Sequence, residues 1–285
     1  MKYISFIKDG QHDFGILEDQ KVYPLRQYLK DHFQLEGKDL RVLLQMEERI
    51  MTDDLTISYS FDEIKVEPPF LEGERNVLCI GKNYLDHVNE IKFLEERNDI
   101  PKEPIYFSKL VDQFKGPDDE IELWGLDNVD YEVELAIIIG KDGKNIPKER
   151  AKEYIFGYTI GNDLSARKLQ MERQQWFKGK SLDGFCPIGP CIVTVDEFEF
   201  PPRRRITSKI NGELRQDSYT DQLIFDIPTI IEDLSRNTTL KRGDIILTGT
   251  PSGVGGGFSK PKYIKKGDIC TCEIEGIGIL ENKFI

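Results

Sequence analysis

The chain has 285 residues, 39% of them hydrophobic, which is enough to build one large domain or a small domain followed by a larger one. Its net charge of −12, from 51 acidic and 39 basic residues, argues against a nucleic-acid-binding protein, for which a basic excess is typical. No apolar run approaches the roughly 20 residues that span a bilayer, and the first residues lack the apolar segment of a signal peptide. We therefore expect a soluble cytoplasmic protein that binds neither nucleic acid nor membrane.

The first 70 residues have the pattern of a small α+β domain. Strand-like alternation covers residues 2–8, 13–17 and 21–25, and helical spacing follows at residues 39–51. Pro68 and Pro69 end this stretch and are typical of a linker. We therefore predict an N-terminal domain at residues 1–70 and a catalytic domain at residues 71–285.

Strands outnumber helices after residue 75. Strand-like runs cover residues 76–81, 105–108, 131–139, 155–160, 191–195, 206–210, 244–248 and 269–274. Helical patterns cover residues 84–97, 147–153, 164–175 and 227–236. Because the helices are not regularly interleaved with the strands, the pattern favours a β-rich α+β core over a doubly wound sheet.

His87 and Glu90 are neighbours, at i and i+3, in the predicted helix at residues 84–97. Such a pair can act as a base whose tautomer and orientation are set by the carboxylate. The alternative is an ordinary surface contact between the two side chains. The chain has three histidines and no Cys-x-x-Cys pair among its five cysteines, so a histidine- or cysteine-rich metal centre is not expected.

Two glutamates interrupt the most apolar of the predicted strands. Glu132 and Glu134 lie in the run Asp-Tyr-Glu-Val-Glu-Leu-Ala-Ile-Ile-Ile-Gly at residues 130–140, and side chains two residues apart point to the same face of a strand. Two carboxylates buried side by side repel each other unless a cation lies between them. Hard divalent metals prefer carboxylate oxygens, so we interpret the pair as metal ligands. The alternative is two exposed glutamates on a solvated face.

A third carboxylate, Asp163, lies where the strand at residues 155–160 meets the start of the predicted helix at residues 164–175. Arg167 and Gln170 follow at i+4 and i+7, so a helix that begins near Asp163 places all three on one face. An arginine beside three carboxylates indicates a site for an anionic substrate. Two alternatives remain open, with Asp163 as a helix N-cap or Arg167 in a salt bridge with Asp163.

Lys180 lies in a Gly-Lys-Ser tripeptide at residues 179–181. A phosphate loop requires a glycine five positions before Gly179, but that residue is Gln174, and no apolar strand leads into the tripeptide. We therefore reject a nucleotide-binding loop and interpret Lys180 as a second cation near the acidic cluster. A surface lysine is the alternative.

A glycine-rich loop follows the strand at residues 244–248. Residues 247–257 read Leu-Thr-Gly-Thr-Pro-Ser-Gly-Val-Gly-Gly-Gly, and such a loop lets backbone N–H groups approach a ligand closely. We assign Thr250, Ser252 and Gly253 to substrate binding. A flexible hairpin connection is the alternative.

Taken together, these motifs resemble the fumarylacetoacetate hydrolase family, from about residue 75 to residue 283. The resemblance rests on six motifs in the family's order: Gly-x-Asn-Tyr-x-x-His-x-x-Glu at 81–90, Asp-Tyr-Glu-x-Glu-Leu at 130–135, Gly-Tyr-Thr-x-x-Asn-Asp-x-Ser-Ala-Arg-x-x-Gln at 157–170, Gly-Lys-Ser at 179–181, Thr-Gly-Thr-Pro-Ser-Gly-Val-Gly at 248–255, and Gly-Asp followed by Glu-Ile-Glu-Gly-Ile-Gly at 267–278. Residues 80–83 lack a further aspartate that precedes the histidine in the animal hydrolase. This departure places the chain with the bacterial branch.

The resemblance implies a mixed β-roll, similar to a β-sandwich, that forms a homodimer. It implies a Mg²⁺ or Mn²⁺ site, in some members Ca²⁺, held by Glu132, Glu134 and Asp163. It also implies that the substrate contacts Arg167, Gln170 and Lys180, and that His87 and Glu90 form an acid/base dyad beside the catalytic Lys180. We add Tyr158, from the Gly-Tyr-Thr motif, to the substrate-binding residues.

From the residues and the resemblance together we predict a hydrolase that cleaves a C–C bond of a small 2,4-dioxo acid through a metal-stabilised enolate. Decarboxylation or tautomerisation of oxaloacetate, or isomerisation of a dicarboxylate from aromatic ring degradation, uses the same enolate, so these reactions stay open. A dicarboxylate requires a second cationic patch, for which the candidates are Lys82, Lys109 and Lys178. The alternative of another class is a non-catalytic Ca²⁺-binding or ligand-sensing module, which leaves the convergence of His87 with the cations unexplained.

Overall fold

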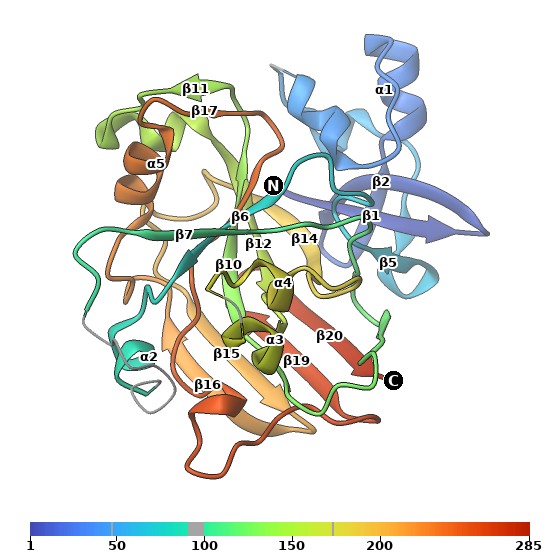
Figure 1. Ribbon diagram of the computed structural model, residues 1–285. Helices are drawn as coiled ribbons and strands as arrows, with labels where there is room; N and C mark the ends of the chain where they lie inside the picture. Colours follow the sequence, from blue (N-terminus) through green and yellow to red (C-terminus); the bar gives the residue numbers. More distant parts are fainter. Residues whose placement is uncertain (47, 91–99, 173) are drawn as a thin grey trace.

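The computed structural model describes residues 1–46, 48–90, 100–172 and 174–285, whose strands form two large sheets (Figure 1). Within these residues the larger sheet has eleven strands. Their hydrogen-bonded order is β4 (Tyr59–Ser60), β3 (Lys21–Pro24), β2 (Gln11–Glu18), β1 (Lys2–Lys8), β14 (Ile188–Thr194), β12 (Ile155–Asn162), β10 (Val133–Ile139), β18 (Ile245–Leu247), β6 (Val77–Gly81) and β7 (Ile105–Lys109), with β5 (Lys65–Glu67) paired to β1.

A second sheet packs against the first, with its strands in contact with β10, β12 and β14. In the described ranges it has five strands, in the order β16 (Glu213–Tyr219), β15 (Arg205–Ile210), β19 (Ile269–Ile274), β20 (Gly278–Phe284) and β8 (Glu120–Ile121). Two small strand pairs accompany the sheets, β11 (Gly143–Lys144) with β17 (Thr239–Leu240) and β13 (Ser165–Ala166) with β9 (Val129–Asp130). Most neighbours are antiparallel, whereas β18–β6 and β20–β8 are parallel, so the predicted β-rich α+β class with mixed sheets is confirmed.

Helices are short and lie around the sheets (Figure 1). The α-helices are α1 (Arg26–Phe33), α2 (Leu85–Glu90), α3 (Arg167–Met171), α4 (Phe177–Lys180) and α5 (Ile227–Ser235). The 3₁₀ helices are Leu40–Gln45, Thr52–Asp54, Phe61–Glu63, Lys148–Tyr154 and Gly255–Gly257. In the part of the chain that the structure describes, no helix is long and apolar enough to cross a membrane.

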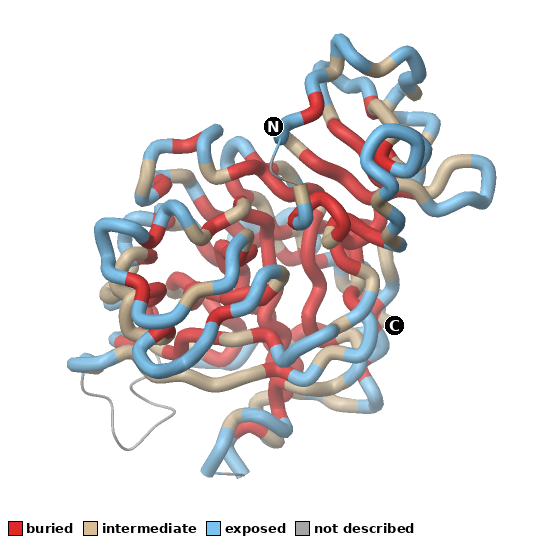
Figure 2. Tube along the Cα trace, turned by 90° about the horizontal axis from the view of Figure 1, so that it is seen from above, coloured by how far each residue is buried: buried red, intermediate tan, exposed pale blue. Residues whose placement is uncertain are grey.

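Strand β10 lies within the larger sheet, and all of its residues are buried. Figure 2 shows that buried residues fill the centre of the molecule. Val133, Leu135 and Ile137 pack into one hydrophobic cluster, whereas Ala136 and Ile138 pack into the other. Since successive side chains of a strand alternate between faces, a strand buried on both faces requires a nearly continuous apolar run. Glu134 is therefore a carboxylate in a strand whose other residues are apolar and buried.

The leading strands continue the larger sheet. The predicted strands at residues 2–8, 13–17 and 21–25 are present as β1, β2 and β3, and β1 pairs antiparallel with β14. Figure 1 shows these strands and α1 at one end of the molecule, and the domain boundary at residue 70 stays a prediction.

The predicted helices differ from the observed ones in several places. The pattern at residues 147–153 corresponds to the 3₁₀ helix Lys148–Tyr154, and α4 was not predicted. The spacing at residues 39–51 corresponds to the 3₁₀ helix Leu40–Gln45, and α1 has no counterpart among the predicted elements. The helix predicted at residues 164–175 begins later, at Arg167, because residues 165–166 pair with β9 as β13. The helix predicted at residues 84–97 is present as α2, and residues 91–97 lie outside the described part of the chain.

Candidate active site

Three carboxylates meet where β10 and β12 lie side by side. Glu132 just precedes β10, Glu134 lies within it, and Asp163 follows β12 directly. Pairing of Val133 with Asn162 brings the two strands into register, and the Asp163 N–H donates to the Glu132 carbonyl at 2.8 Å. All three side chains are buried, and carboxylate oxygens of the three lie within 4.8 Å of one another. The predicted metal ligands are thus brought together.

Two of the predicted cations pair with this cluster. Lys180, at the end of α4, donates to Glu132 Oε2 at 2.7 Å and to Asp163 Oδ2 at 2.6 Å. Arg167 Nη2 lies 2.7 Å from Glu132 Oε1, and Arg167 Nη1 donates to Gln170 Oε1 at 3.0 Å. Lys180 is therefore buried and not a surface lysine. Asp163 is not an N-cap, because α3 begins at Arg167. The alternative of a salt bridge between Arg167 and Asp163 is also wrong, because Arg167 pairs with Asp130 and Glu132.

A third cation, Lys109, enters from β7 and is fully buried. Its ammonium group donates to Asp163 Oδ1 and, at 3.0 Å, to the carbonyl of Leu164. We considered Lys109 for a patch at the far end of a dicarboxylate, but the structure places it against a carboxylate of the acidic cluster. The sequence showed only that Lys109 follows a predicted strand. It did not show which strands lie beside that one, so the contact with Asp163 could not be predicted.

The charges of this region favour an additional cation. Four carboxylates are buried here, those of Asp130, Glu132, Glu134 and Asp163. Three cations pair with them: Lys109 and Lys180, which are buried, and Arg167, which is partly buried. Burial raises the pKa of Glu134 well above its usual range, and the charges of Asp163 and Glu132 raise it further. Burial also acts to raise the pKa of Glu132, but the charges of Lys180 and Arg167 outweigh it and hold this pKa well below its usual range. A carboxylate accepts up to about four hydrogen bonds, so these side chains retain capacity for a metal ion.

Asp130 is a site residue that we did not predict. Its carboxylate accepts from the N–H groups of Gly255 at 2.6 Å and Gly256 at 2.9 Å, and from Arg167 Nε at 2.8 Å. Although burial acts to lower the pKa of Arg167, the charges of Asp130 and Glu132 raise it above its usual value. Asp130 therefore joins the glycine-rich loop to the arginine. It is the first residue of the motif at residues 130–135, but the motif did not indicate this role.

The His87–Glu90 pair lies on α2 and contacts the glycine-rich loop. His87 Nδ1 lies 3.4 Å from Glu90 Oε2, and Glu90 Oε1 accepts from the Gly253 N–H at 2.8 Å. His87 is 6% exposed, so the alternative of a surface contact does not describe this histidine. The loop also holds Glu134, whose Oε2 accepts from the Gly249 N–H at 2.7 Å.

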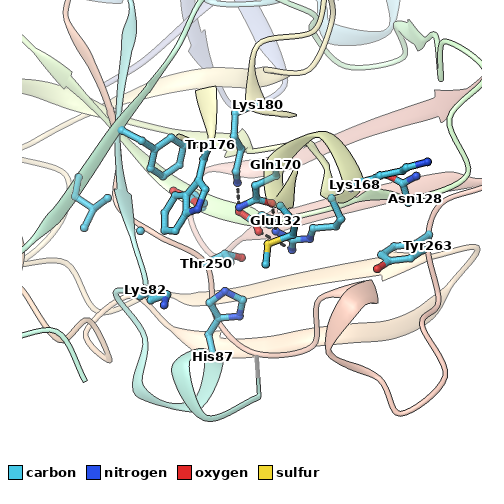
Figure 3. Close-up of a pocket in the computed structure, with 16 residues that line it drawn as sticks. Lys82, His87, Asn128, Glu132, Lys168, Gln170, Trp176, Lys180, Thr250 and Tyr263 are labelled. Atoms are coloured by element: carbon cyan, nitrogen blue, oxygen red, sulfur yellow. Dashed lines mark hydrogen bonds and ion pairs between the residues drawn. The ribbon is translucent and has the colours of Figure 1, made fainter. Parts of the chain in front are cut away.

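Some of these groups line one cavity of about 350 Å³ (Figure 3), whereas Glu90, Lys109, Asp130 and Asp163 are not among its lining residues. Of the predicted site residues, the lining includes His87, Glu132, Glu134, Arg167, Gln170, Lys180 and Thr250. It also contains residues that we did not predict: Ile80, Gly81, Phe107, Asn128, Lys168, Met171, Trp176 and Tyr263, besides Lys82. Figure 3 shows His87 on the opposite side of the cavity from Lys180 and Glu132.

Three predicted substrate contacts do not line this cavity. Tyr158 is fully buried and stacks on Phe198, with ring centroids 6.1 Å apart, because its position in β12 turns it into the core. Ser252 and Gly253 belong to the glycine-rich loop but are absent from the lining, and the Gly253 N–H donates to Glu90 instead. The assignment of Tyr158 to the substrate is therefore corrected.

A comparison with known families decides the membership of the chain. Residues 76–285 match the model of the fumarylacetoacetate (FAA) hydrolase C-terminal domain. The chain belongs to the fumarylacetoacetate hydrolase family. It is therefore an enzyme of this family, as the six motifs indicated.

Individual relatives within the family carry different activities in their names. The chain is 39% identical over 286 residues to oxaloacetate tautomerase YisK of Bacillus subtilis, with 94% of each chain covered. It is 41% identical over 229 residues to the mitochondrial oxaloacetate tautomerase fahd2 of Xenopus laevis, covering 79% of this chain and 70% of the relative. The solved structure of a fumarylacetoacetate hydrolase from Exiguobacterium antarcticum superposes with a TM-score of 0.86 at 39% identity, covering 100% of this chain and 99% of the other.

Proposed function

We propose that this protein moves a proton at the carbon beside the keto group of a small 2-oxo acid, and that its reaction is the keto–enol tautomerisation of oxaloacetate. The observation that carries the proposal is the position of His87 across one cavity from the carboxylates and Lys180 (Figure 3). Enolate formation requires a base near the carbon and positive charge near the oxygen of the same substrate. The tautomerases of Bacillus subtilis and Xenopus laevis, which are similar over most of this chain, support this choice of reaction.

Glu132, Glu134 and Asp163 would hold the divalent metal, for which Mg²⁺ and Mn²⁺ are our first candidates and Ca²⁺ the next. An all-oxygen set of buried carboxylates suits hard cations of this kind. When bound, the metal supplies Lewis-acid stabilisation of negative charge on the substrate.

Arg167, Gln170 and Lys180 bind and orient the acid. Arg167 is held by Asp130 on one side and by Gln170 on the other, so its guanidinium group is fixed before a substrate carboxylate arrives. Lys180 places a positive charge beside the carboxylate cluster, where the enolate oxygen develops charge. These three side chains account for the carboxylate and keto oxygens of a 2-oxo acid.

His87 moves the proton to and from C3. With its Nδ1 facing Glu90, the histidine keeps Nε2 for the substrate, and Glu90 is itself held by the Gly253 N–H. The contact of 3.4 Å between His87 and Glu90 is longer than an ideal hydrogen bond, as is common for catalytic pairs without ligand. The dyad thus supplies the proton transfer that tautomerisation needs.

Hydrolysis of a C–C bond in a 2,4-dioxo acid is the second candidate. The same His87–Glu90 pair can activate a water molecule for attack on the distal carbonyl. The observation that favours this reaction is the similarity to the Exiguobacterium antarcticum protein, which is named a hydrolase.

The two candidates separate in one set of assays. Purified protein with Mg²⁺ or Mn²⁺ is expected to accelerate the decay of enol-oxaloacetate absorbance. The rate of this decay should be much higher than the rate of pyruvate formation from oxaloacetate and the rate of acylpyruvate cleavage. Removal of metal with a chelator is expected to abolish the acceleration. Faster acylpyruvate cleavage would favour the hydrolase, and no activity on any of these acids would favour a non-catalytic module.

Replacing Asp130 with asparagine is expected to raise KM for oxaloacetate by about tenfold and to change kcat less, since a charge-assisted contact to Arg167 is lost. Asparagine keeps the size of the side chain and one oxygen for the Gly255 N–H, whereas its NH₂ group cannot accept from the Gly256 N–H or from Arg167. The exposed Asp127, three residues upstream, gives the matched control Asp127→Asn, which should leave both constants unchanged. An unchanged KM in Asp130→Asn would remove Asp130 from substrate binding.

A further inference from the structure

The cavity has an apolar wall that the proposed proton transfer does not use. Its apolar lining residues are Ile80, Phe107, Met171 and Trp176. Figure 3 shows Trp176 on the side of the cavity opposite Lys168, Asn128 and Tyr263. A cavity of about 350 Å³ is near the lower end of the volumes typical for ligand pockets, so one large side chain in its wall has a strong effect on what fits.

The indole of Trp176 is held in place by its neighbours. A Cβ atom on Gly81 would lie 2.3 Å from Cζ3 and 2.8 Å from Cη2 of Trp176, so the ring lies against the backbone at the end of β6. Phe107, from β7, contacts the ring edge to face, with centroids 5.3 Å apart and planes at 73°. The ring therefore contacts two neighbouring strands of the larger sheet and has little freedom to make room for a ligand.

Trp176 directly precedes α4, the short helix that ends with Lys180. The Gly179 N–H donates to the Trp176 carbonyl at 3.0 Å, and Lys180 Nζ lies 5.1 Å from the centre of the Phe107 ring. A Cβ atom on Gly179 would lie 2.6 Å from the backbone nitrogen of Gln170, so α4 and α3 are in close contact and cannot shift independently. The apolar wall is thus built onto the element that positions the catalytic lysine.

We propose that Trp176 is the specificity-determining residue of this enzyme, and that its indole limits the substrate to short 2-oxo acids. This inference rests on the proposed function, because it assumes that the carboxylate and keto groups of the acid face Arg167 and Lys180. The carbon at C3 then lies against the indole, and the C4 carboxylate of oxaloacetate lies past the ring toward Lys82, which also lines the cavity. A flat, apolar and immobile face accommodates a planar enol but leaves no space for an extended or branched tail.

The test measures affinity and therefore does not depend on turnover. Dissociation constants of pyruvate and of 2-oxohexanoate are measured by calorimetry with saturating Mg²⁺ for the parent protein and for Trp176→Phe and Trp176→Ala. The parent is expected to prefer pyruvate. In Trp176→Ala the ratio of the two constants should shift by about tenfold or more toward 2-oxohexanoate, since each added methylene changes binding in an apolar pocket by about that factor. Trp176→Phe, which keeps an aromatic ring, should fall between.

Phe177 provides the matched control, because it directly follows Trp176 as the first residue of α4, is 40% exposed and is absent from the cavity lining. Phe177→Ala should leave the ratio unchanged, and an equal shift in Phe177→Ala would overturn the inference. If Trp176→Ala no longer binds pyruvate, the ratio in Trp176→Phe decides. If the parent binds both acids and the ratio is the same in all variants, Trp176 is not the determinant. If the parent binds neither acid, the proposed function fails as well.

Discussion

Glu134→Gln is expected to lose divalent-metal binding and yet, without metal, to unfold at the temperature of the parent or above it. Burial and the charges of Asp163 and Glu132 favour the neutral form of Glu134, and glutamine is a neutral side chain of the same shape that keeps an oxygen for the Gly249 N–H. The parent should gain about 2.7 kcal/mol of stability when Mg²⁺ or Mn²⁺ is present at a hundred times its Kd, and the variant should gain none. Thermal unfolding with and without metal measures both effects.

The exposed Glu149 provides the control for this variant. Glu149→Gln removes the same charge from the chain and should keep the full metal-dependent rise in unfolding temperature. If Glu134→Gln also keeps that rise, the acidic cluster is not a metal site. If Glu134→Gln without metal unfolds at a much lower temperature than the parent, attraction between Glu134 and the neighbouring cations stabilises the fold. In that case Glu134 is not destabilised by the other two carboxylates, contrary to what we propose.

Glu134 separates metal binding from folding better than Asp163 does. Asp163 accepts from both Lys109 and Lys180, so its removal leaves two buried ammonium groups without this partner. Loss of one member of a buried ion pair costs about 3–5 kcal/mol, which would lower activity through unfolding alone. Glu134 accepts from a backbone N–H instead, and an amide side chain can replace it there.

His87→Gln is expected to lower kcat for oxaloacetate tautomerisation by about 10²–10⁴-fold while metal binding is retained. Glutamine is polar and of similar length, but it cannot accept and release a proton near neutral pH. His87 lies across the cavity from the carboxylates and is not one of the three clustered side chains, so the metal-dependent rise in unfolding temperature should persist. The exchange of C3 hydrogens of pyruvate in deuterated water should slow by a similar factor.

His32, exposed on α1, provides the control for the histidine substitution. His32→Gln should leave turnover, hydrogen exchange and metal binding as in the parent. Loss of the metal response in His87→Gln would mean that the histidine belongs to the metal site, whereas unchanged turnover would assign the proton transfer to another group.

The larger part of the fold follows from local patterns in the chain. The strands at residues 76–81, 105–108, 155–160, 206–210 and 269–274 are all present, because β-branched and aromatic runs between turn residues report a strand without any knowledge of its partners. β16 and β20 were not predicted, since residues 213–219 and 278–284 carry many polar side chains. Each forms a hairpin with the strand that directly precedes it, β15 or β19, so the pairing partner and not the composition makes it a strand. The Asn-Gly turn at residues 211–212 was the local signal for the first hairpin.

The spacing of Glu132 and Glu134 in one extended segment determined that two carboxylates would be neighbours, because side-chain alternation is a property of the extended backbone alone. Only the tertiary structure decided which groups surround them. Lys109 reaches Asp163 from a strand 54 positions earlier, and Asp130 accepts from loop N–H groups 125 and 126 positions later. Tyr158 belongs to a family motif, yet its side chain lies in the core. Trp176 belongs to none of the six motifs, yet it lines the cavity. The reason is that contacts of this kind depend on strand register and sheet packing, which join distant segments and leave no periodic trace along the chain.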